Sequence, residues 1–220
     1  MHVELEVEMD QARIQAQISK GLAKAASIIG ANFVHYRPTT ALGPVLVGIG
    51  TISCGFDSSA SLAMTSPSPP GHPFALLLAD TSLLEAGDYL VGQDTYFVSR
   101  IQPLVPAWCV LCNVVLDILD TVQDTAEGTN AYGGVTSASN SLIAQGWPMS
   151  MLARSRGEQD VTKLPTDTRS AFFEILMPSI PGVTLGLGLC LQDSNGQRYQ
   201  IMSWENTAYG CKLLAGTATT

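Results

Sequence analysis

The three histidines are the side chains of this sequence that are best suited to acid–base catalysis. They are His2, His35 and His72. A catalytic histidine needs a carboxylate or a nucleophile beside it, and no Gly-x-Ser-x-Gly motif presents a serine for that role. A structural histidine is the commoner case at positions such as His35. We therefore expect no catalytic residue and no enzyme. A pocket that joined His35 or His72 to a carboxylate would indicate otherwise.

The cysteine pair Cys109-x-x-Cys112 has the spacing of half a zinc site or of a redox pair. A zinc site needs a second pair or nearby histidines, but the next cysteine is Cys190. A redox pair needs a helix N-terminus that lowers the thiol pKa. In a strand the two side chains would face opposite sides. The spacing therefore favours two small core side chains, and five cysteines are too few for a disulfide scaffold.

Two glycine pairs could suggest a nucleotide site. Gly48-x-Gly50 lacks the third glycine at dinucleotide spacing, and no phosphate-binding loop motif occurs. Gly186-x-Gly188 falls in an expected strand, where it indicates a bulge or a close approach of another backbone. We expect no bound cofactor.

Clustered carboxylates and tryptophans are the remaining candidates for a binding site. Asp117, Asp120 and Asp124 are spaced closely enough for a metal site, although solvated loop carboxylates are commoner. The three tryptophans could form a platform for a ligand, but anchors of a core or an interface are the commoner use; they are Trp108, Trp147 and Trp204. We predict no metal site.

The composition limits the partners that the chain can have. Charged residues are 14% of the 220 and hydrophobic residues 46%, whereas roughly 25% charged is usual. Such a surface indicates either long neutral loops or a surface covered by other subunits. The net charge of −8 argues against a protein that grips phosphates, but it suits a wall along which DNA passes without binding.

With no apolar run of ~18 residues and no signal-peptide pattern at the N-terminus, we expect synthesis in the cytoplasm and no membrane partner.

The first 38 residues are expected to form an arm and a helix. Acidic and apolar residues alternate over 1–9, which predicts a short strand that pairs with a neighbour, or a frayed terminus. Apolar residues then recur at three- and four-residue spacing from Asp10 to Ile29, which predicts an amphipathic helix with Asp10 as its N-cap. Gly30 suits the position that ends it.

The rest of the chain indicates β structure. Expected strands are separated by turns, a Ser/Pro-rich loop and a long polar segment; they cover Val45–Cys54, Phe74–Leu78, Gly87–Val91, Thr95–Ser99, Trp108–Leu119, Phe172–Met177, Leu185–Gln192, Arg198–Trp204 and Gly210–Ala215. The exposed loop is expected over Ser58–Pro73. A turn is expected at Asp193–Gly196. A buried helix over Trp108–Leu119 is the alternative to a strand.

The fold class that follows is mainly β, with barrel- or sandwich-like units and one N-terminal amphipathic helix. We expect an arm and helix over 1–38, a first β unit over 39–120, a long polar loop over 121–168 with a short strand or turn near Leu142–Trp147, and a second β unit over 169–220. Alternatively, 39–220 is one domain. Gly87–Leu111 and Gly182–Leu214 share an order of strands and turns, which indicates a duplication, although ordinary hairpins would also produce it.

Several short motifs occur in order along the chain. They are Ala26-x-x-x-Gly30, Tyr36-Arg37-Pro38, Gly87-Asp88-Tyr89-Leu90-Val91, Thr95-Tyr96-Phe97-Val98, Gln102-Pro103-Leu104 with the Val/Cys run after it, Asp193-x-x-Gly196-x-Arg198-Tyr199 and Gly210-x-x-Leu213. In this order they resemble a group of structural proteins of tailed bacteriophages and prophages. The segment 121–168 matches that group only around Gly146-Trp147-Pro148.

The resemblance implies a non-enzymatic virion protein. It would form an oligomeric ring in the phage tail, as a baseplate-proximal ring or a head–tail neck connector, through β contacts between subunits. Its partners would be copies of itself and other tail or neck proteins, with DNA at most passing through the lumen. It would be located in the virion. The alternative is a carbohydrate- or receptor-binding β module of a tail, which predicts exposed aromatic residues and would be weakened by a sequestered Trp147.

Overall fold

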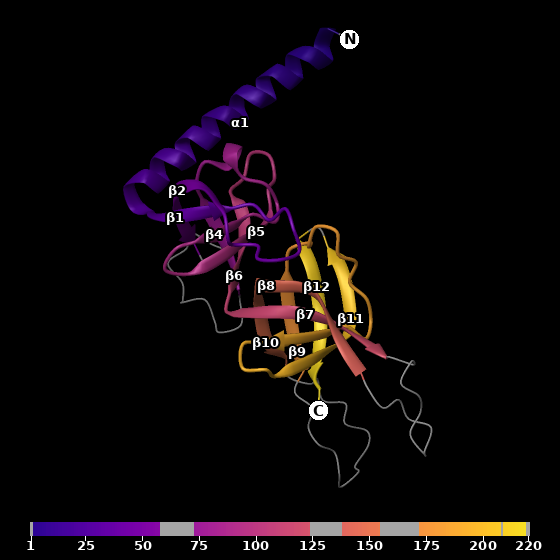
Figure 1. Cartoon of the computed structure of the whole chain (residues 1–220). Coiled ribbons are helices and arrows are strands. Elements are labelled where there is room, and N and C mark those ends of the chain that lie inside the picture. Colours follow the sequence, from indigo (N-terminus) through magenta and orange to yellow (C-terminus); the bar gives the residue numbers. More distant parts are fainter. Residues whose placement is uncertain (1, 58–72, 124–137, 155–171, 208, 219–220) are drawn as a thin grey trace, which may run out of the picture. The chain divides into compact units, whose positions relative to one another are not determined.

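The computed structural model describes residues 2–57, 73–123, 138–154, 172–207 and 209–218 (Figure 1). Within these residues it contains one long α-helix, one 3-10 turn and twelve strands that close into two barrels. The expected fold class, mainly β with one N-terminal helix, is confirmed. Most of the expected loop over Ser58–Pro73, including His72, lies outside the described residues, as does Asp124.

The helix α1 (His2–Ile29) has 28 residues and is the longest element. The predicted helix over Asp10–Ile29 is confirmed, but the predicted strand over 1–9 is wrong, and Asp10 is an internal residue rather than the N-cap. The physical reason is that extending a helix adds one hydrogen bond for each residue that is fixed. A lone strand gains nothing until another strand pairs with it.

Gly30 ends α1 where the chain turns back into the first strand. Its N–H donates to the carbonyl oxygen of Ala26 at 2.8 Å. A Cβ at Gly30 would lie 2.5 Å from the carbonyl oxygen of Cys54 and closer still to that of Ala26. Only a residue without a side chain allows the two backbones to come this close.

The first barrel contains six antiparallel strands. They are β1 (Ala31–Tyr36), β2 (Gly48–Asp57), β3 (Phe74–Leu78), β4 (Tyr89–Val91), β5 (Thr95–Arg100) and β6 (Ala107–Cys112), with the 3-10 turn η1 (Thr81–Leu83) between β3 and β4. The order around the barrel is β1-β2-β3-β6-β5-β4. Its core is formed by side chains that alternate inward along each strand: Phe33, Cys54, Leu77, Ala79, Leu84, Leu90, Val98, Ala107 and Cys109.

The second barrel also contains six strands. They are β7 (Val114–Gln123), β8 (Ala138–Arg154), β9 (Phe172–Met177), β10 (Cys190–Asp193), β11 (Arg198–Thr207) and β12 (Gly210–Thr217). The order around this barrel is β10-β11-β12-β9-β8-β7. Its core includes nine side chains that are at most 2% exposed: Leu116, Ile118, Trp147, Met149, Ile175, Met177, Leu191, Ile201 and Leu213.

The two barrels have the same topology. If β1 to β6 are matched in sequence order with β7 to β12, every neighbouring pair of the first barrel has its counterpart in the second. The two stretches that look alike in the sequence, Gly87–Leu111 and Gly182–Leu214, contain β4 to β6 and β10 to β12, the matching halves. The repeated unit is therefore a whole six-stranded barrel, which is larger than the similarity in the sequence.

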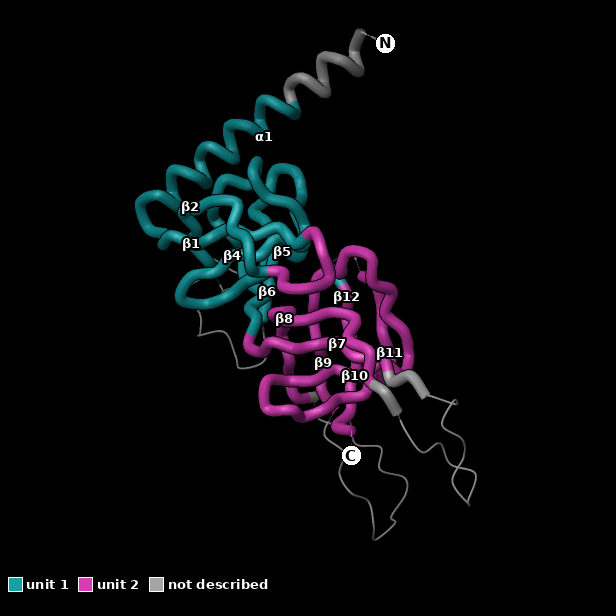
Figure 2. The backbone as a smooth tube through the Cα atoms, in the orientation of Figure 1, with its two compact units in different colours: residues 1–38, 45–112, 208–210 teal, residues 39–44, 113–207, 211–220 magenta. Residues whose placement is uncertain are grey.

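The chain divides into two compact units, shown in Figure 2. The first contains residues 1–38, 45–112 and 208–210, and the second contains 39–44, 113–207 and 211–220. The helix is thus part of the first unit, and the boundary falls after Cys112, where the sequence had suggested 120. The segment 121–168 is not one long loop, because the 17-residue strand β8 occupies its centre.

Trp108–Leu119 forms two strands of different barrels, β6 and β7, where one strand was predicted. The break is at Asn113. Its side-chain amide donates to the carbonyl oxygen of Met151 at 2.8 Å and accepts from the N–H of Met151 at 2.7 Å, while its own N–H donates to Met149. Because these bonds imitate a backbone ladder, Asn113 starts the pairing of β7 with β8.

The strand expected over Leu185–Gln192 is shorter in the structure. The strand begins only at Cys190, because Gly188 lies in a turn with φ +89°. The glycine pair Gly186-x-Gly188 is therefore outside a strand. The next turn, at Asp193–Gly196, is confirmed: Gly196 has φ +80°, and the Asp193 carboxylate accepts from the N–H groups of Asn195 and Gln197.

Candidate functional site

His35 and Asp88 form a buried pair in the first barrel. Alternation along β1 turns Phe33 and His35 inward, and Asp88 directly precedes β4. The Nε2 atom of His35 lies 2.7 Å from Oδ2 of Asp88, with the side chains 5% and 1% exposed. This is the histidine–carboxylate pair that a catalytic site would need, but here both partners lie inside the barrel wall.

Arg37 completes the cluster from the other side. Its Nε donates to Oδ1 of Asp88 at 2.9 Å, and a terminal nitrogen donates to Oδ2 at 2.8 Å. The guanidinium also pairs with Glu85 at 2.7 Å and donates to the carbonyl oxygen of Leu83 at 3.2 Å. The N–H of Glu85 donates to Asp88 at 2.8 Å. Asp88 therefore joins the end of β1 to the loop that leads into β4.

The electrostatics of the cluster stabilise the charged form of Asp88. Burial by itself would raise the pKa of this carboxyl, but the hydrogen bonds from Arg37, the Glu85 N–H and His35 outweigh burial and lower it. The hydrogen bond to Asp88 also raises the pKa of Arg37, against the effect of its own burial. The buried Asp88 carboxylate thus accepts hydrogen bonds from Arg37, from His35 and from the backbone of Glu85.

The burial of His35 and its hydrogen bond to Asp88 favour the structural role that the sequence predicts for this histidine. The sequence did not identify Asp88 as its partner, although both Arg37 and Asp88 belong to the ordered motifs. The signal available was a charged residue in each of two motifs, Arg37 and Asp88, but no strand was predicted over Ala31–Tyr36, where β1 lies. Nothing in the sequence shows that the two strands are neighbours.

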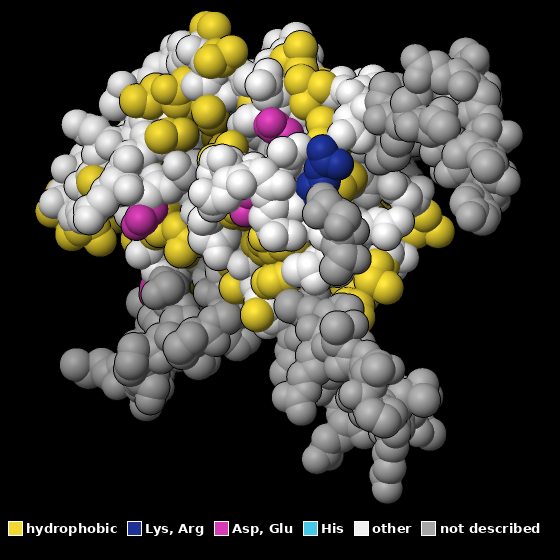
Figure 3. All heavy atoms as spheres, turned by 60° about the horizontal axis from the view of Figure 1, so that its bottom comes forward, with side chains coloured by type: hydrophobic (Ala, Val, Ile, Leu, Met, Phe, Trp, Pro, Cys, Tyr) yellow, Lys and Arg dark blue, Asp and Glu magenta, His cyan; other side chains and the backbone are white. Residues whose placement is uncertain are grey.

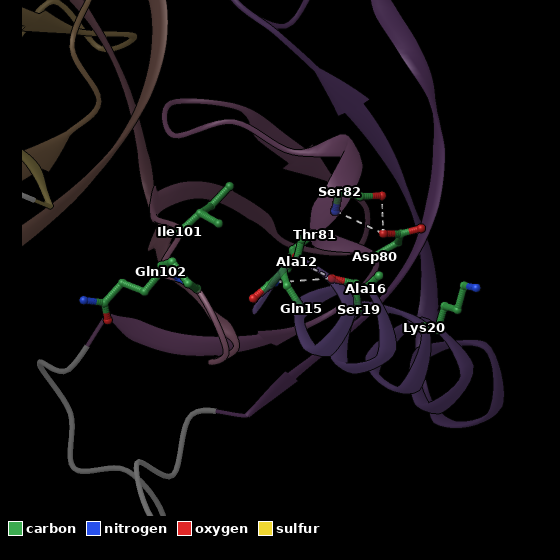
Figure 4. Close-up of a pocket in the computed structure, with 11 residues that line it drawn as sticks. Ala12, Gln15, Ala16, Ser19, Lys20, Asp80, Thr81, Ser82, Ile101 and Gln102 are labelled. Carbon is green, nitrogen blue, oxygen red and sulfur yellow. Dashed lines mark hydrogen bonds between the residues drawn. The ribbon is translucent and has the colours of Figure 1, made fainter. Parts of the chain in front are cut away.

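A cavity with a volume of about 630 Å³ lies along α1 in the first unit (Figure 4). The helix contributes Gln15, Ala16 and Ser19 to one wall, and η1 contributes Thr81 and Ser82 to the other. Across this groove the hydroxyl groups of Ser19 and Thr81 lie 3.3 Å apart. The Oε1 atom of Gln15 accepts from the N–H of Leu104 at 2.5 Å.

Leu104, next to this groove, is the one non-glycine residue with positive φ among those described, at +66°. It belongs to the Gln102-Pro103-Leu104 motif, whose first two residues line the groove. A leucine rarely adopts this conformation, and the bond from Gln15 helps to hold it. The motif thus shapes the contact between α1 and the loop after β5. The charged residues that line the groove are Lys20 and Asp80, and no described lining residue is a histidine or cysteine.

The cysteines of the first barrel lie in surroundings that disfavour a thiolate. Burial raises the pKa of Cys54 and of Cys112 to about 12, and it also raises the pKa of Cys109 well above its ordinary value. Cys109 is part of the core, while Cys112 is half-buried at the end of β6. A metal ligand or redox thiol needs the opposite shift.

Asp117 has a structural partner within the second barrel. The pairing of β7 with β8 shifts between Leu116 and Ile118, and at this bulge the Asp117 carboxylate accepts from the N–H of Gly146 at 2.7 Å. Gly146 has φ +72°. Asp120 is exposed. In the part of the chain that the structure describes, no three acidic, histidine or cysteine residues come together as metal ligands.

The three tryptophans have different surroundings. Trp147 is fully buried, and its indole N–H donates to the carbonyl oxygen of Ala41 at 2.7 Å. Trp108 is half-buried beside Phe74, with ring centroids 6.5 Å apart. Trp204 is 40% exposed at the edge of a cavity of about 150 Å³ in the second unit. Trp108 also borders a cavity, of about 190 Å³, together with Phe74 and Tyr209, so Trp108 and Trp204 line open space and Trp147 does not.

Large apolar side chains are exposed on both units. Figure 3 shows hydrophobic side chains open on the face in view, with charged side chains sparse among them. The most exposed ones described are Val47 at 81% and Leu46 at 78%, followed by Ile28, Ile29 and Leu187. A surface of this kind favours contacts with other protein surfaces.

The chain matches no family model, no curated protein and no solved structure. Among its described residues, no helix has both the length and the apolar character needed to cross a membrane. The site therefore has to be interpreted from its own geometry.

Proposed function

We propose that this chain is a non-enzymatic structural subunit that assembles with copies of itself. The observation that carries the proposal is the surface: many large apolar side chains are exposed on a chain with 14% charged residues. A monomer would keep such residues covered or scattered. Depletion of charge is typical of the centre of a subunit interface.

The specific assembly we propose is a ring in the tail of a tailed bacteriophage, at a baseplate-proximal or neck position. The support for this step is the resemblance of the ordered motifs. Four of these motifs have clear architectural roles here: Arg37 of one pairs with Asp88 of another, Leu104 contacts α1, and Asp193 forms the turn between β10 and β11. Such roles suit a scaffold better than a catalyst.

The test is the state of the purified chain at increasing concentration. Multi-angle light scattering should give a mass several times 23.3 kDa, and negative-stain images should show rings. A chain that stays a monomer at millimolar concentration would contradict the proposal.

A carbohydrate- or receptor-binding module is a second candidate, favoured by Trp204. This side chain borders a small cavity together with Thr184 and Asn206, and an exposed aromatic ring beside polar groups suits a sugar. The burial of Trp147 argues against a wider aromatic platform. Binding on a glycan array that is lost in Trp204→Ala would support this candidate over the ring.

A further inference from the structure

The first half of β2 is the most exposed strand segment of the first unit. All six residues from Leu46 to Thr51 are exposed, including Leu46, Val47 and Ile49. We call residues 46–53 the β2 edge. It combines large apolar side chains with a backbone that, from Gly48 onward, is already in the extended form that pairs with other strands; Leu46 and Val47 lie in the bend just before the strand.

The β2 edge has a strand partner on one side only among the described residues. β1 pairs with it from Gly48 to Cys54, whereas β3 pairs with β2 only at Gly55–Asp57. Among the described residues of the first unit, no strand pairs with the N–H and C=O groups that point away from β1, so they present an edge to which another strand can be added. The register shift near Tyr36 leaves Ile49 without an opposite residue, so a regular ladder would run along residues 50–53.

The usual protection of an open edge is missing from this segment. Between Val45 and Phe56 there is no charged residue and no proline. Soluble proteins commonly place lysine or proline on such edges to prevent pairing with another molecule. The bulge at Ile49 is the one protective feature present, and it turns an isoleucine toward solvent.

Gly50 gives an independent indication of an approaching backbone. A Cβ at Gly50 would meet no atom within 4 Å, while one at Gly48 would lie 2.9 Å from Cγ1 of Val34. The packing of Val34 thus favours a glycine at position 48, whereas nothing described in this chain requires a glycine at position 50. A glycine in a strand weakens it, so its use at position 50 fits a site where another backbone comes close.

We infer that the β2 edge is where a second copy of this chain docks, by adding one of its strands to the open side of β2. The inference rests on the proposed self-assembly and names its surface. Charge favours a copy as the occupant. Each copy carries −8, so like charges oppose their approach except where neither surface is charged, and the β2 edge is such a place. A ring requires that a different surface of the second copy meet this edge.

Charge placed on the edge tests the inference. The double variant Ile49→Lys/Thr51→Lys should be monomeric at concentrations where the wild type is assembled. Its circular dichroism spectrum and melting temperature should match those of the wild-type monomer. The matched control is Leu187→Lys, which adds charge at an exposed apolar residue outside any strand and should still assemble.

Gly50→Val provides a second variant that the monomer can tolerate, because its side chain meets nothing in this chain. It should keep the fold and weaken assembly at least tenfold. In the wild-type assembly, hydrogen exchange along residues 50–53 should slow about tenfold or more relative to the diluted monomer, as a shared ladder requires.

The outcomes separate the two ideas. If the lysine variant and Gly50→Val both assemble like the wild type, the β2 edge is not the docking surface, although self-assembly stands. If the wild type never assembles, the proposed function fails and the inference fails with it. Loss of assembly in Leu187→Lys as well would also overturn the inference, because an added positive charge would then prevent assembly wherever it is placed on the surface.

Discussion

His35 and Asp88 are 53 residues apart in the sequence, and their side chains meet at 2.7 Å inside the first barrel. The pair connects β1 to the segment before β4, two strands that are neighbours in the sheet. Because Arg37 reaches the same carboxylate, Asp88 holds the end of β1 to the loop before β4 through two side chains of one segment. A buried charge of this kind is costly unless every partner is present.

Replacement of Asp88 by Asn should therefore strongly destabilise the first barrel. The amide keeps the size of the side chain but leaves Arg37 without its buried counter-charge. We expect the free energy of unfolding to fall by about 3 kcal/mol, measured by urea denaturation. The control is Glu85→Gln, which removes the exposed partner of Arg37 and should change stability by about 1 kcal/mol or less. Equal effects of the two variants would contradict a buried role for Asp88.

The same carboxyl should make stability depend on pH at the acidic end. Its pKa is lowered in the folded state, so its contribution is complete above the unfolded pKa of about 3.9. That contribution is lost as the pH falls through the lower folded value. The difference in unfolding free energy between wild type and Asp88→Asn should thus be constant from pH 5 to 7 and shrink below pH 4. The groups facing Asp88 are His35, Arg37 and Glu85.

If the difference in unfolding free energy between wild type and Asp88→Asn is unchanged at pH 2.5, then Asp88 stabilises the barrel through packing and not through its charge. Glu85→Gln should show no comparable trend, which controls for the general effect of acid on the other carboxylates. Urea unfolding at each pH supplies the measurement.

Gly30 and Gly21 form a matched pair within α1 and its end. A Cβ at Gly30 would collide with the carbonyl oxygens of Ala26 and Cys54, while one at Gly21 would meet nothing within 4 Å. Gly30→Ala should destabilise the first unit by about 1–3 kcal/mol, as overpacking does. Gly21→Ala should stabilise it by up to about 1 kcal/mol through helix propensity.

Thermal unfolding of the two variants should move in opposite directions. A melting temperature of Gly30→Ala that is unchanged or raised would show that the close contact between α1 and β2 is not maintained in solution, and a fall for Gly21→Ala would contradict the predicted gain in helix propensity. The test is direct because both changes add the same single methyl group.

The sequence predicted those elements whose evidence is local. The 3.6-residue period identified most of α1, and the turn at Asp193–Gly196 was predicted from residues that accept positive φ. The similarity of Gly87–Leu111 to Gly182–Leu214 indicated half of each barrel. These features depend on neighbours in the chain, so a single sequence contains them.

The errors concern features that depend on distant partners. Only the part of β8 near Leu142–Trp147 was predicted, as a short strand or turn, because its first residues are small and polar. The full strand is stabilised by β7 on one side and β9 on the other. The break at Asn113 depends on Met151, which is 38 residues away. Asp88 in the candidate cluster depends on His35 and Arg37 in the same way. Local pattern could mark these residues as unusual, but it could not identify their partners.

The thiols of the first barrel supply a last prediction, which separates a structural Cys-x-x-Cys from a reactive one. Burial raises the pKa of Cys112 to about 12, whereas a free thiol has a pKa of about 8.5. At pH 8 its thiolate fraction, and with it the alkylation rate, should be lower than that of a free thiol by on the order of a thousandfold. Cys109 should react more slowly still, because its side chain is fully buried and the reagent cannot reach it, while Cys112 is only half-buried. Iodoacetamide labelling followed by mass spectrometry would measure both rates, and labelling in urea would confirm that all five cysteines can react. Rapid joint alkylation of Cys109 and Cys112 in the folded chain, or their protection by one equivalent of zinc, would show that the pair is chemically active and not part of the packing.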